Sequence, residues 1–298
     1  MIDEAFMAMG GFGKLQKISY FMNTLINGGA ALFIYCFVFL EKEPVYECLE
    51  GTEWKECATA AYCALPDAER SIDWHSQESL HNLIETFKFY CEPPAMIGLI
   101  GAAFLMGVVI GSLTLTRLGD VHGRRPIFML GLVMHLGFMA GIMVVTNYIL
   151  CYVLVFIFGL SLTARYYVGY AYNVEMQPKS HYVLVGTSMF LIESVAYLSI
   201  CFYFMYVSRY WKPLQIPNIV FISAGVVFLC FMPESPRFLI SKRRFEDARD
   251  VFKWIGKVNG LSREEAERRL DEIVFDGEDR EYKDPNPEAA FSTLLKDA

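Results

Sequence analysis

Apolar residues along this chain gather in six runs, each about as long as a helix that crosses a bilayer. Hydrophobic residues make up 54% of the 298 positions, and the runs cover residues 18–40, 95–116, 126–146, 148–172, 182–207 and 214–232. About 20 consecutive apolar residues cross the hydrocarbon core, where the backbone must satisfy its own hydrogen bonds. The pattern therefore predicts an all-α membrane protein with six transmembrane helices rather than a large soluble helical protein.

The polar stretches between these runs divide the chain further. We expect a lead at 1–17, a first span at 18–40, an outer loop at 41–94, five more spans within 95–232, intracellular helices at 233–275 and a poorly ordered polar tail at 276–298. Pro236 suits the first turn of a helix and Gly260 its end. Ser262, with Glu265 three residues later, predicts a capping box that begins a second helix.

Charge predicts the orientation in the membrane. The formal net charge is −7, with an acidic excess in 41–94 and a basic pair, Arg124 and Arg125, in the short turn between the second and third runs. Basic residues in short loops favour the cytoplasmic side. Both ends are then inside and 41–94 is outside, although Arg209 and Lys212 on the outer side run against the rule. We expect no cleavable signal peptide and no Arg-rich presequence.

Half of the eight cysteines fall in the outer loop, namely Cys48, Cys57, Cys63 and Cys91. Such a cluster in an exposed loop predicts two disulfides in an oxidising compartment, with three pairings open. A metal site is the alternative, but there is no C-x-x-C, and His75 and His81 lack finger-like spacing. No phosphate-binding loop, catalytic triad or HExxH motif occurs. We expect no metal, cofactor, enzymatic activity or nucleic-acid partner.

Three motifs occur in a meaningful order. Gly11-Phe12-Gly13-Lys14-Leu15-Gln16 precedes the first run, Asp120…Gly123-Arg124-Arg125 joins the second and third, and Pro233-Glu234-Ser235-Pro236-Arg237-Phe238-Leu239 follows the sixth. They resemble the G-x-F-G-x-x-Q, G-x-x-x-D-R-x-G-R-R/K and P-E-S-P-R-W-L elements of the major facilitator superfamily. The Cys-containing loop and the ending Gly169-Tyr170…Glu175 are similar to its organic cation/anion transporter branch, which is related to the sugar porters.

That resemblance implies a fold with two six-helix halves, of which this chain covers the first half and the following intracellular helices. Substrate sites in this fold lie between halves that rock against each other. One reading is a half-size organic ion transporter that moves a small organic solute only with a second half. The other is a transport-inactive accessory subunit of a larger membrane complex, such as a respiratory one. The expected partners are lipids and either a second half or other membrane subunits. The resemblance implies the plasma membrane, and the accessory reading admits the mitochondrial inner membrane.

The resemblance also implies a cytoplasmic gating cluster, made of Asp120, Arg124, Arg125, Glu175, Glu234 and Arg237. The alternative is that these charges only anchor helix ends. The chain departs from the family at Val121 and Val155, where many members have Arg. After Glu175, the turn offers Lys179 and His181 in place of an arginine. These losses favour the accessory reading.

Two charges fall inside predicted spans, Arg165 in the fourth and Glu193 in the fifth. A charge in lipid costs about 2.5–3.5 kcal/mol on insertion scales, so each should face inward and find a partner. They either line a cavity, where Glu193 would attract a cation, or form a structural ion pair with each other. Nearby tyrosines from Tyr166 to Tyr172 suit either ligand stacking or helix packing, and we expect His135 to be a packed polar residue rather than a proton relay.

Overall fold

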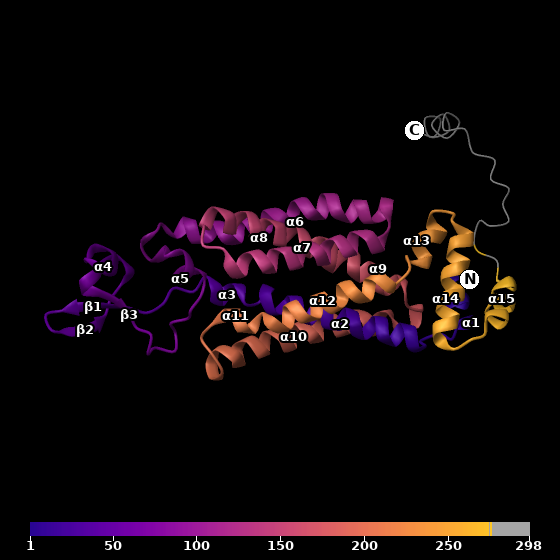
Figure 1. The fold of residues 1–298 in the computed structure, drawn as a ribbon, viewed down its shortest axis with the longest axis horizontal. Coiled ribbons are helices and arrows are strands. Elements are labelled where there is room, and N and C mark those ends of the chain that lie inside the picture. The colour runs from indigo at the N-terminus through magenta and orange to yellow at the C-terminus, as the bar shows by residue number, and fades with distance from the viewer. Residues whose placement is uncertain (274, 276–298) are drawn as a thin grey trace, which may run out of the picture.

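The computed structural model describes residues 1–273 and 275, and six helical segments in them are long and apolar enough to cross a membrane. They are α2 with α3 (Lys14–Ile34, Phe37–Leu40), α6 (Pro94–His122), α7 (Arg124–Val144), α8 with η3 and α9 (Tyr148–Leu162, Thr163–Val168, Gly169–Glu175), η4 with α10 (Lys179–His181, Tyr182–Tyr206), and α11 with α12 (Trp211–Leu214, Ile216–Phe231). The six predicted spans are confirmed, and Figure 1 shows them as one elongated bundle.

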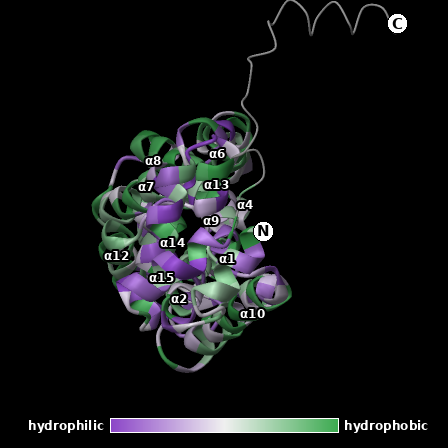
Figure 2. Ribbon diagram, turned by 90° about the vertical axis from the view of Figure 1, so that its right-hand side faces the viewer, coloured by the Kyte–Doolittle hydropathy of each residue, from purple (hydrophilic) through white to green (hydrophobic). Residues whose placement is uncertain are grey.

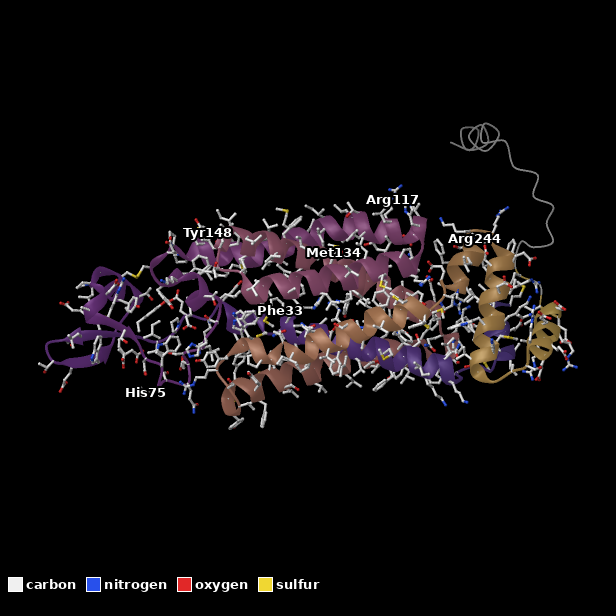
Figure 3. All side chains as sticks on the ribbon, in the orientation of Figure 1. Phe33, His75, Arg117, Met134, Tyr148 and Arg244 are labelled. Atoms are coloured by element: carbon white, nitrogen blue, oxygen red, sulfur yellow. A yellow bond between two sulfur atoms is a disulfide. The ribbon has the colours of Figure 1, made fainter. Side chains whose placement is uncertain are left out.

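Aromatic side chains fill the half of the bundle nearest the 41–93 segment. Phe33 on α2 lies inside it (Figure 3), with ring-centroid distances of 4.8 Å to Phe138 and 5.0 Å to Phe158. Trp211 closes the same cluster from α11, at 6.3 Å from Phe33. Edge-to-face contacts at these distances add to the hydrophobic burial of large rings. This core fixes α2, α7, α8 and α11 relative to one another.

Glycines bring α6 and α8 into direct backbone contact. A Cβ atom on Gly107 would lie 2.2 Å from the carbonyl oxygen of Phe156, and one on Gly159 would lie 2.2 Å from that of Phe104. Small residues on facing sides allow membrane helices to approach closely. Gly107 on α6 and Gly159 on α8 therefore allow these two helices to pack closely.

The segment between the first two spans forms a cap at one end of the bundle (Figure 1). It contains a three-stranded antiparallel sheet in the order β2-β1-β3, with β1 Tyr46–Glu50, β2 Glu53–Glu56 and β3 Arg70–Ile72. Short helices complete the cap: α4 Thr59–Ala64, η1 Asp67–Glu69, α5 Leu83–Phe87 and η2 Phe89–Cys91. Disulfides join Cys48 to Cys57 and Cys63 to Cys91, which confirms two bridges and selects one of three pairings.

The N-terminal segment and the helices after span 6 pack together at the opposite end, where polar residues predominate (Figure 2). These elements are α1 Ile2–Ala8, α13 Pro236–Ser241, α14 Phe245–Asn259 and α15 Arg263–Asp271. Gly260 ends α14 in a left-handed conformation, as predicted, and the Ser262 hydroxyl accepts from the Glu265 N–H at 3.2 Å. The Glu265 side chain pairs with Arg269, so the structure shows the Ser262 half of the predicted capping box. The single helix expected from Pro236 is wrong, because the chain breaks at Arg243, which has φ +59°. The expectation for 276–298 lies outside the described residues.

Asn259, the last residue of α14, holds the N-terminal lead in place. Its side-chain oxygen accepts from the Leu15 N–H at 3.0 Å, and its amide nitrogen donates to the Met9 carbonyl at 2.8 Å. Gly13 allows this contact, because a Cβ there would lie 2.4 Å from the Asn259 side-chain carbon. The end of α14 therefore holds the glycine-containing turn that precedes span 1.

Glu41 lies where span 1 meets the cap, and burial dominates its chemistry. One carboxyl oxygen, Oε1, is buried without a hydrogen-bond partner in the described chain. Burial raises the pKa of the Glu41 carboxyl to about 6, because loss of solvent disfavours the charged form. Between pH 4.5, the ordinary pKa of a glutamate carboxyl, and about pH 6, the folded chain therefore keeps a proton on Glu41 that the unfolded chain has lost.

We expect Gly107→Ala to lower the free energy of unfolding by about 1–3 kcal/mol, because the added methyl group forces two backbones apart. Gly98→Ala on the same helix is the matched control, since no atom lies within 4 Å of a Cβ there. Gly98→Ala should leave the free energy of unfolding unchanged or raise it by up to about 1 kcal/mol, because alanine favours a helix more than glycine does. Thermal unfolding in detergent measures both, and equal melting temperatures would contradict the close approach.

We expect the stability of the wild-type chain, relative to Glu41→Gln, to fall as pH rises from about 4.5 to 6 and then to level off. A carboxyl whose folded pKa is raised favours the native state only while it is protonated, here by about 1–2 kcal/mol. Melting temperatures of both proteins across pH 4–8 provide the measurement. A constant difference between them would show that Glu41 is not desolvated.

Candidate functional site

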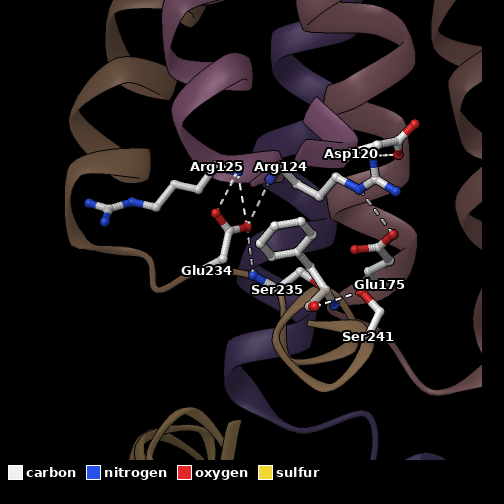
Figure 4. Close-up of polar contacts among 8 residues, drawn as sticks. Asp120, Arg124, Arg125, Glu175, Glu234, Ser235 and Ser241 are labelled. Carbon is white, nitrogen blue, oxygen red and sulfur yellow. Dashed lines mark hydrogen bonds and ion pairs between the residues drawn. The ribbon is translucent and has the colours of Figure 1, made fainter. Parts of the chain in front are cut away.

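Arg124 clasps the ends of three spans at the end opposite the cap. Its guanidinium pairs with Asp120 on the last turn of α6, and its Nε donates to Glu175 Oε1 on α9 at 3.2 Å. Figure 4 shows the arginine lying between the two carboxylates. The Arg124 and Glu175 side chains are largely shielded, with exposed fractions of 18% and 19%. Charge-assisted pairs in such surroundings are stronger than exposed ones.

Glu234 caps the first turn of α7. Its carboxylate accepts from the backbone N–H of Arg124 and of Arg125, both at 3.1 Å, and from that of Ser235 at 2.9 Å. The first N–H groups of a helix lack internal partners and favour a negative charge. Gly123 permits this approach, because it has φ +120° and a Cβ there would lie 2.2 Å from Glu234 Oε2.

Arg125 and Arg237, the other predicted members, lie apart from this set. The Arg125 side chain extends away from the carboxylates (Figure 4) and donates to the carbonyls of Leu229 at 3.2 Å and Cys230 at 2.9 Å, at the end of α12. Arg237 instead pairs with Asp3 on α1 at 2.9 Å. The structure thus joins Asp120, Arg124, Glu175 and Glu234, and it gives the two remaining arginines other partners.

Asp3 is a residue that the sequence analysis missed. Besides Arg237, it accepts from the backbone N–H of Lys179 at 3.0 Å, and the Lys179 side chain lies 3.8 Å from its carboxylate. His181 stacks on Phe12 of the lead, with ring centroids 4.1 Å apart. Only the acidic character of the lead could have signalled this contact. The N-terminal segment therefore ties together the ends of spans 4, 5 and 6.

A second group of polar residues lies between the spans. A pocket of about 170 Å³ is lined by residues of α2, α8, η3 and α10, including Asn27, Tyr35, Arg165, Tyr166 and Glu193. The η3 segment is a single π-helical stretch inside span 4, a distortion that is frequent at functional sites. The pocket therefore receives residues from spans 1, 4 and 5.

Arg165 is 1% exposed, and its Nη1 donates to Asn27 Oδ1 at 3.4 Å. Glu193 lines the same pocket and accepts from the Tyr35 hydroxyl at 3.2 Å. Within the described chain, no nitrogen of Arg165 lies within 4.0 Å of the Glu193 carboxylate. The two charges thus share a pocket without a direct contact.

His135 belongs to a separate buried contact. Its Nε2 lies 3.0 Å from Asn218 Oδ1, and Asn218 in turn donates to Gln215 at 3.2 Å. His135 and Asn218 are both fully buried.

Tyr172 is also fully buried, and its hydroxyl donates to the Pro233 carbonyl at 2.8 Å, while Tyr167 and Tyr170 are exposed. The tyrosine run is thus divided between helix packing and open surfaces.

The two polar groups differ in their chemistry. Among the described residues, no three His, Cys, Asp or Glu side chains gather closely enough to hold a metal ion. The first group consists of ion pairs at helix ends, which can break and reform when helices tilt. The second is a small pocket that carries both signs of charge. This chemistry suits binding and conformational change.

Comparison with known proteins places these features in a family. Residues 54–283 match the family described as "Sugar (and other) transporter". The "Organic cation transporter protein" of Drosophila melanogaster is 24% identical to this chain over an alignment of 331 residues. The alignment covers 99% of this chain and 60% of that protein. The mouse "Solute carrier family 22 member 4" is 27% identical over an alignment of 306 residues, which covers 87% of this chain and 55% of the mouse protein. A solved structure of the Escherichia coli xylose transporter, partially occluded and inward open, has a TM-score of 0.49 and 14% identity, covering 86% of this chain and 58% of that one.

The family match covers most of the chain, and the six spans fit one half of the major facilitator fold, as the sequence predicted. The chain spans little more than half the length of the fly and mouse relatives that it matches. It is an integral multi-pass membrane protein by its helices and its relatives. The chain belongs to the sugar (and other) transporter family and is organic cation transporter-like within it.

Proposed function

We propose that the chain is one six-helix half of a carrier for small organic ions, and that it moves its solute only together with a second half. The observation that carries this proposal is that Arg124 forms ion pairs with both Asp120 and Glu175. It joins spans 2, 3 and 4 at one end through contacts that a tilt of the helices would break. A carrier needs such a latch, whereas a static subunit does not.

The pocket at Arg165 and Glu193 supports the same proposal. It is lined by spans 1, 4 and 5, which in this fold face the opposite half across the solute path. Large apolar side chains are also exposed along α6 and α10, including Leu105, Leu113, Phe190 and Leu198. A second half would cover part of this apolar surface and close the pocket. The solute is an organic ion, since the pocket offers charges and aromatic rings rather than neutral hydrogen-bonding groups alone.

The runner-up is an accessory subunit without transport of its own, and two observations favour it. Val121 and Val155 stand where many family members carry arginine. Lys179 pairs with Asp3 rather than with Glu175, whose Oε2 is buried without a partner in the described residues. The latch thus holds fewer cations than the family pattern provides. An accessory subunit would keep the helix anchors and lose the motion.

We expect transport from a fusion protein that supplies the missing half. The chain is joined, through roughly 20 Gly/Ser residues spanning about 25 Å on average, either to a second copy of itself or to the second half of the Drosophila organic cation transporter protein. Proteoliposomes that contain either fusion should take up labelled choline above empty vesicles, and the single chain should not. Absence of uptake with both fusions would favour the accessory reading.

We expect Arg124→Gln in the active fusion to reduce uptake by roughly tenfold, since a loss of about 1.4 kcal/mol in a charge-assisted contact has that effect. Solute affinity should stay unchanged, because Arg124 lies at the helix ends and not among the pocket residues. Arg117→Gln is the matched control, an exposed arginine on the same end of α6 that points away from the bundle (Figure 3). Equal uptake by both variants would argue against the latch.

A further inference from the structure

Residues 73–82 of the cap form a strap, and both ends of the strap are fixed to span 1 and the segment that follows it. At the start of the strap, the Asp73 N–H donates to the Val45 carbonyl at 2.9 Å. At its end, the buried Asn82 side chain donates to the Phe39 carbonyl at 2.9 Å. A hydrogen bond of a buried amide is costly to break, because the amide would be left without a partner. The strap therefore moves together with span 1.

The middle of the strap holds the turn between α10 and α11. The His81 N–H donates to the Arg209 carbonyl at 3.1 Å, and the ring of His81 stacks on that of Tyr210 with centroids 4.1 Å apart. The other face of the His81 ring stacks on Trp74, at 4.2 Å. The Arg209 guanidinium donates to the Trp74 carbonyl and, at 3.2 Å, to that of His75, which lies at this end of the bundle (Figure 3). We call this set of contacts the cap clamp.

The cap clamp acts on a span that lies at the edge of the bundle. The helix of span 5, α10, packs chiefly against α2, and large apolar side chains such as Phe190, Leu198 and Phe202 are exposed along it. On the other side of the turn, Trp211 is 2% exposed and belongs to the aromatic core. Trp211 is therefore a fixed point, and the cap clamp restrains the end of α10 just before it.

Open space lies on both sides of the strap. A pocket of about 250 Å³ is lined by Gln77 and Leu80 of the strap and by Cys201 and Met205 of α10. Another pocket, of about 360 Å³, is lined by His81 together with residues of α5 and α11. Packed protein interiors contain few voids larger than a water molecule. A contact that lies between two such hollows can break without disrupting a core, so the cap clamp is suited to release.

We propose that the strap is a releasable clamp, which ties the end of span 5 nearest the cap to span 1 and frees it when the ring stack on Tyr210 opens. Tyr35 of span 1 and Glu193 of span 5 line a pocket between these two spans. While the clamp is closed, span 5 cannot tilt away from span 1 at the cap end of this pocket. The clamp is a property of the single chain, and only its effect on transport rests on the proposed function.

Hydrogen exchange of the purified full chain in detergent, read by mass spectrometry of its peptides, tests the clamp. Tyr210→Ala removes one side of the ring stack and should speed exchange in two segments, the strap and the last turns of α10 at 200–206, by about three- to tenfold. Tyr210→Phe keeps the ring and should exchange as the wild type does. Lys212→Gln is the matched control in the same turn, because Lys212 donates to the Met143 carbonyl on α7. It should leave strap exchange within about twofold of the wild type.

A chemical bridge supplies the opposite perturbation. Gln77 lines the same pocket as the free thiol of Cys201, so a short bifunctional thiol reagent can join Gln77→Cys on the strap to α10. The bridge should slow exchange at 200–206 by about tenfold, and it should lower uptake by an active fusion by at least about tenfold. Gln77→Cys combined with Cys201→Ser cannot be bridged, so the same reagent should leave its exchange and its uptake unchanged.

The outcomes separate this inference from the proposed function. Equal strap exchange in the wild type and in Tyr210→Ala overturns the clamp, whether or not the fusions transport. Strap exchange that occurs only together with that of the α7 core shows a static cap and also overturns it. Full uptake by a bridged fusion overturns it as well, since span 5 would then not need to be freed. Faster exchange in Tyr210→Ala that the bridge reverses, without uptake by any fusion, supports the clamp and removes the carrier.

Discussion

The carboxylate of Glu234 is the contact on which the end opposite the cap depends. It accepts three backbone N–H groups, two from the first turn of α7 and one from Ser235. A full negative charge satisfies groups that a helix cannot satisfy itself. Because Glu234 makes these contacts, the guanidinium of Arg124 is left to bridge Asp120 and Glu175. One residue after span 6 thereby orders the ends of spans 2, 3 and 4.

Sequence predicted most of this architecture because hydrophobic length is a local property. A run of about 20 apolar residues crosses a bilayer whatever its neighbours are, so all six spans could be found. The Ser262 cap and the Gly260 end are equally local. The β-sheet of the cap was not predicted, because its strands are only three to five residues long and β1 pairs with β3, which follows α4 and η1 in the chain.

Partner choice among charges could not be predicted in the same way. Arg237 follows span 6 in a motif that implies the gating cluster, yet it pairs with Asp3 from the other end of the chain. Arg125 stands beside Arg124 in sequence but caps the carbonyls of α12. Each cation has several acceptors within reach, and helix docking decides which one lies nearest. The motif therefore locates the cluster without specifying its bonds.

The cations at the cap end show why a charge rule has exceptions. Arg209 donates to the carbonyls of Trp74 and His75, and Lys212 donates to the Met143 carbonyl at 2.8 Å. His81 stacks between Trp74 and Tyr210, with ring centroids 4.2 Å and 4.1 Å away. Arg209 fastens the cap to the turn between α10 and α11, and Lys212 ties α11 to the end of α7, so both are retained although the positive-inside rule disfavours them.

Arg165 represents the opposite case, a charge whose local contacts do not account for its position. The buried arginine costs insertion energy, and one long contact with a neutral amide repays little of it. Arg124, Arg125 and Arg237 at helix ends find carboxylates or carbonyls, so the fold has the means to satisfy an arginine where stability alone is at stake. The π-helical stretch that carries Arg165 interrupts the regular turn of span 4 at the same point. The distortion and the unused donors thus lie together at the wall of the pocket that Arg165 shares with Glu193.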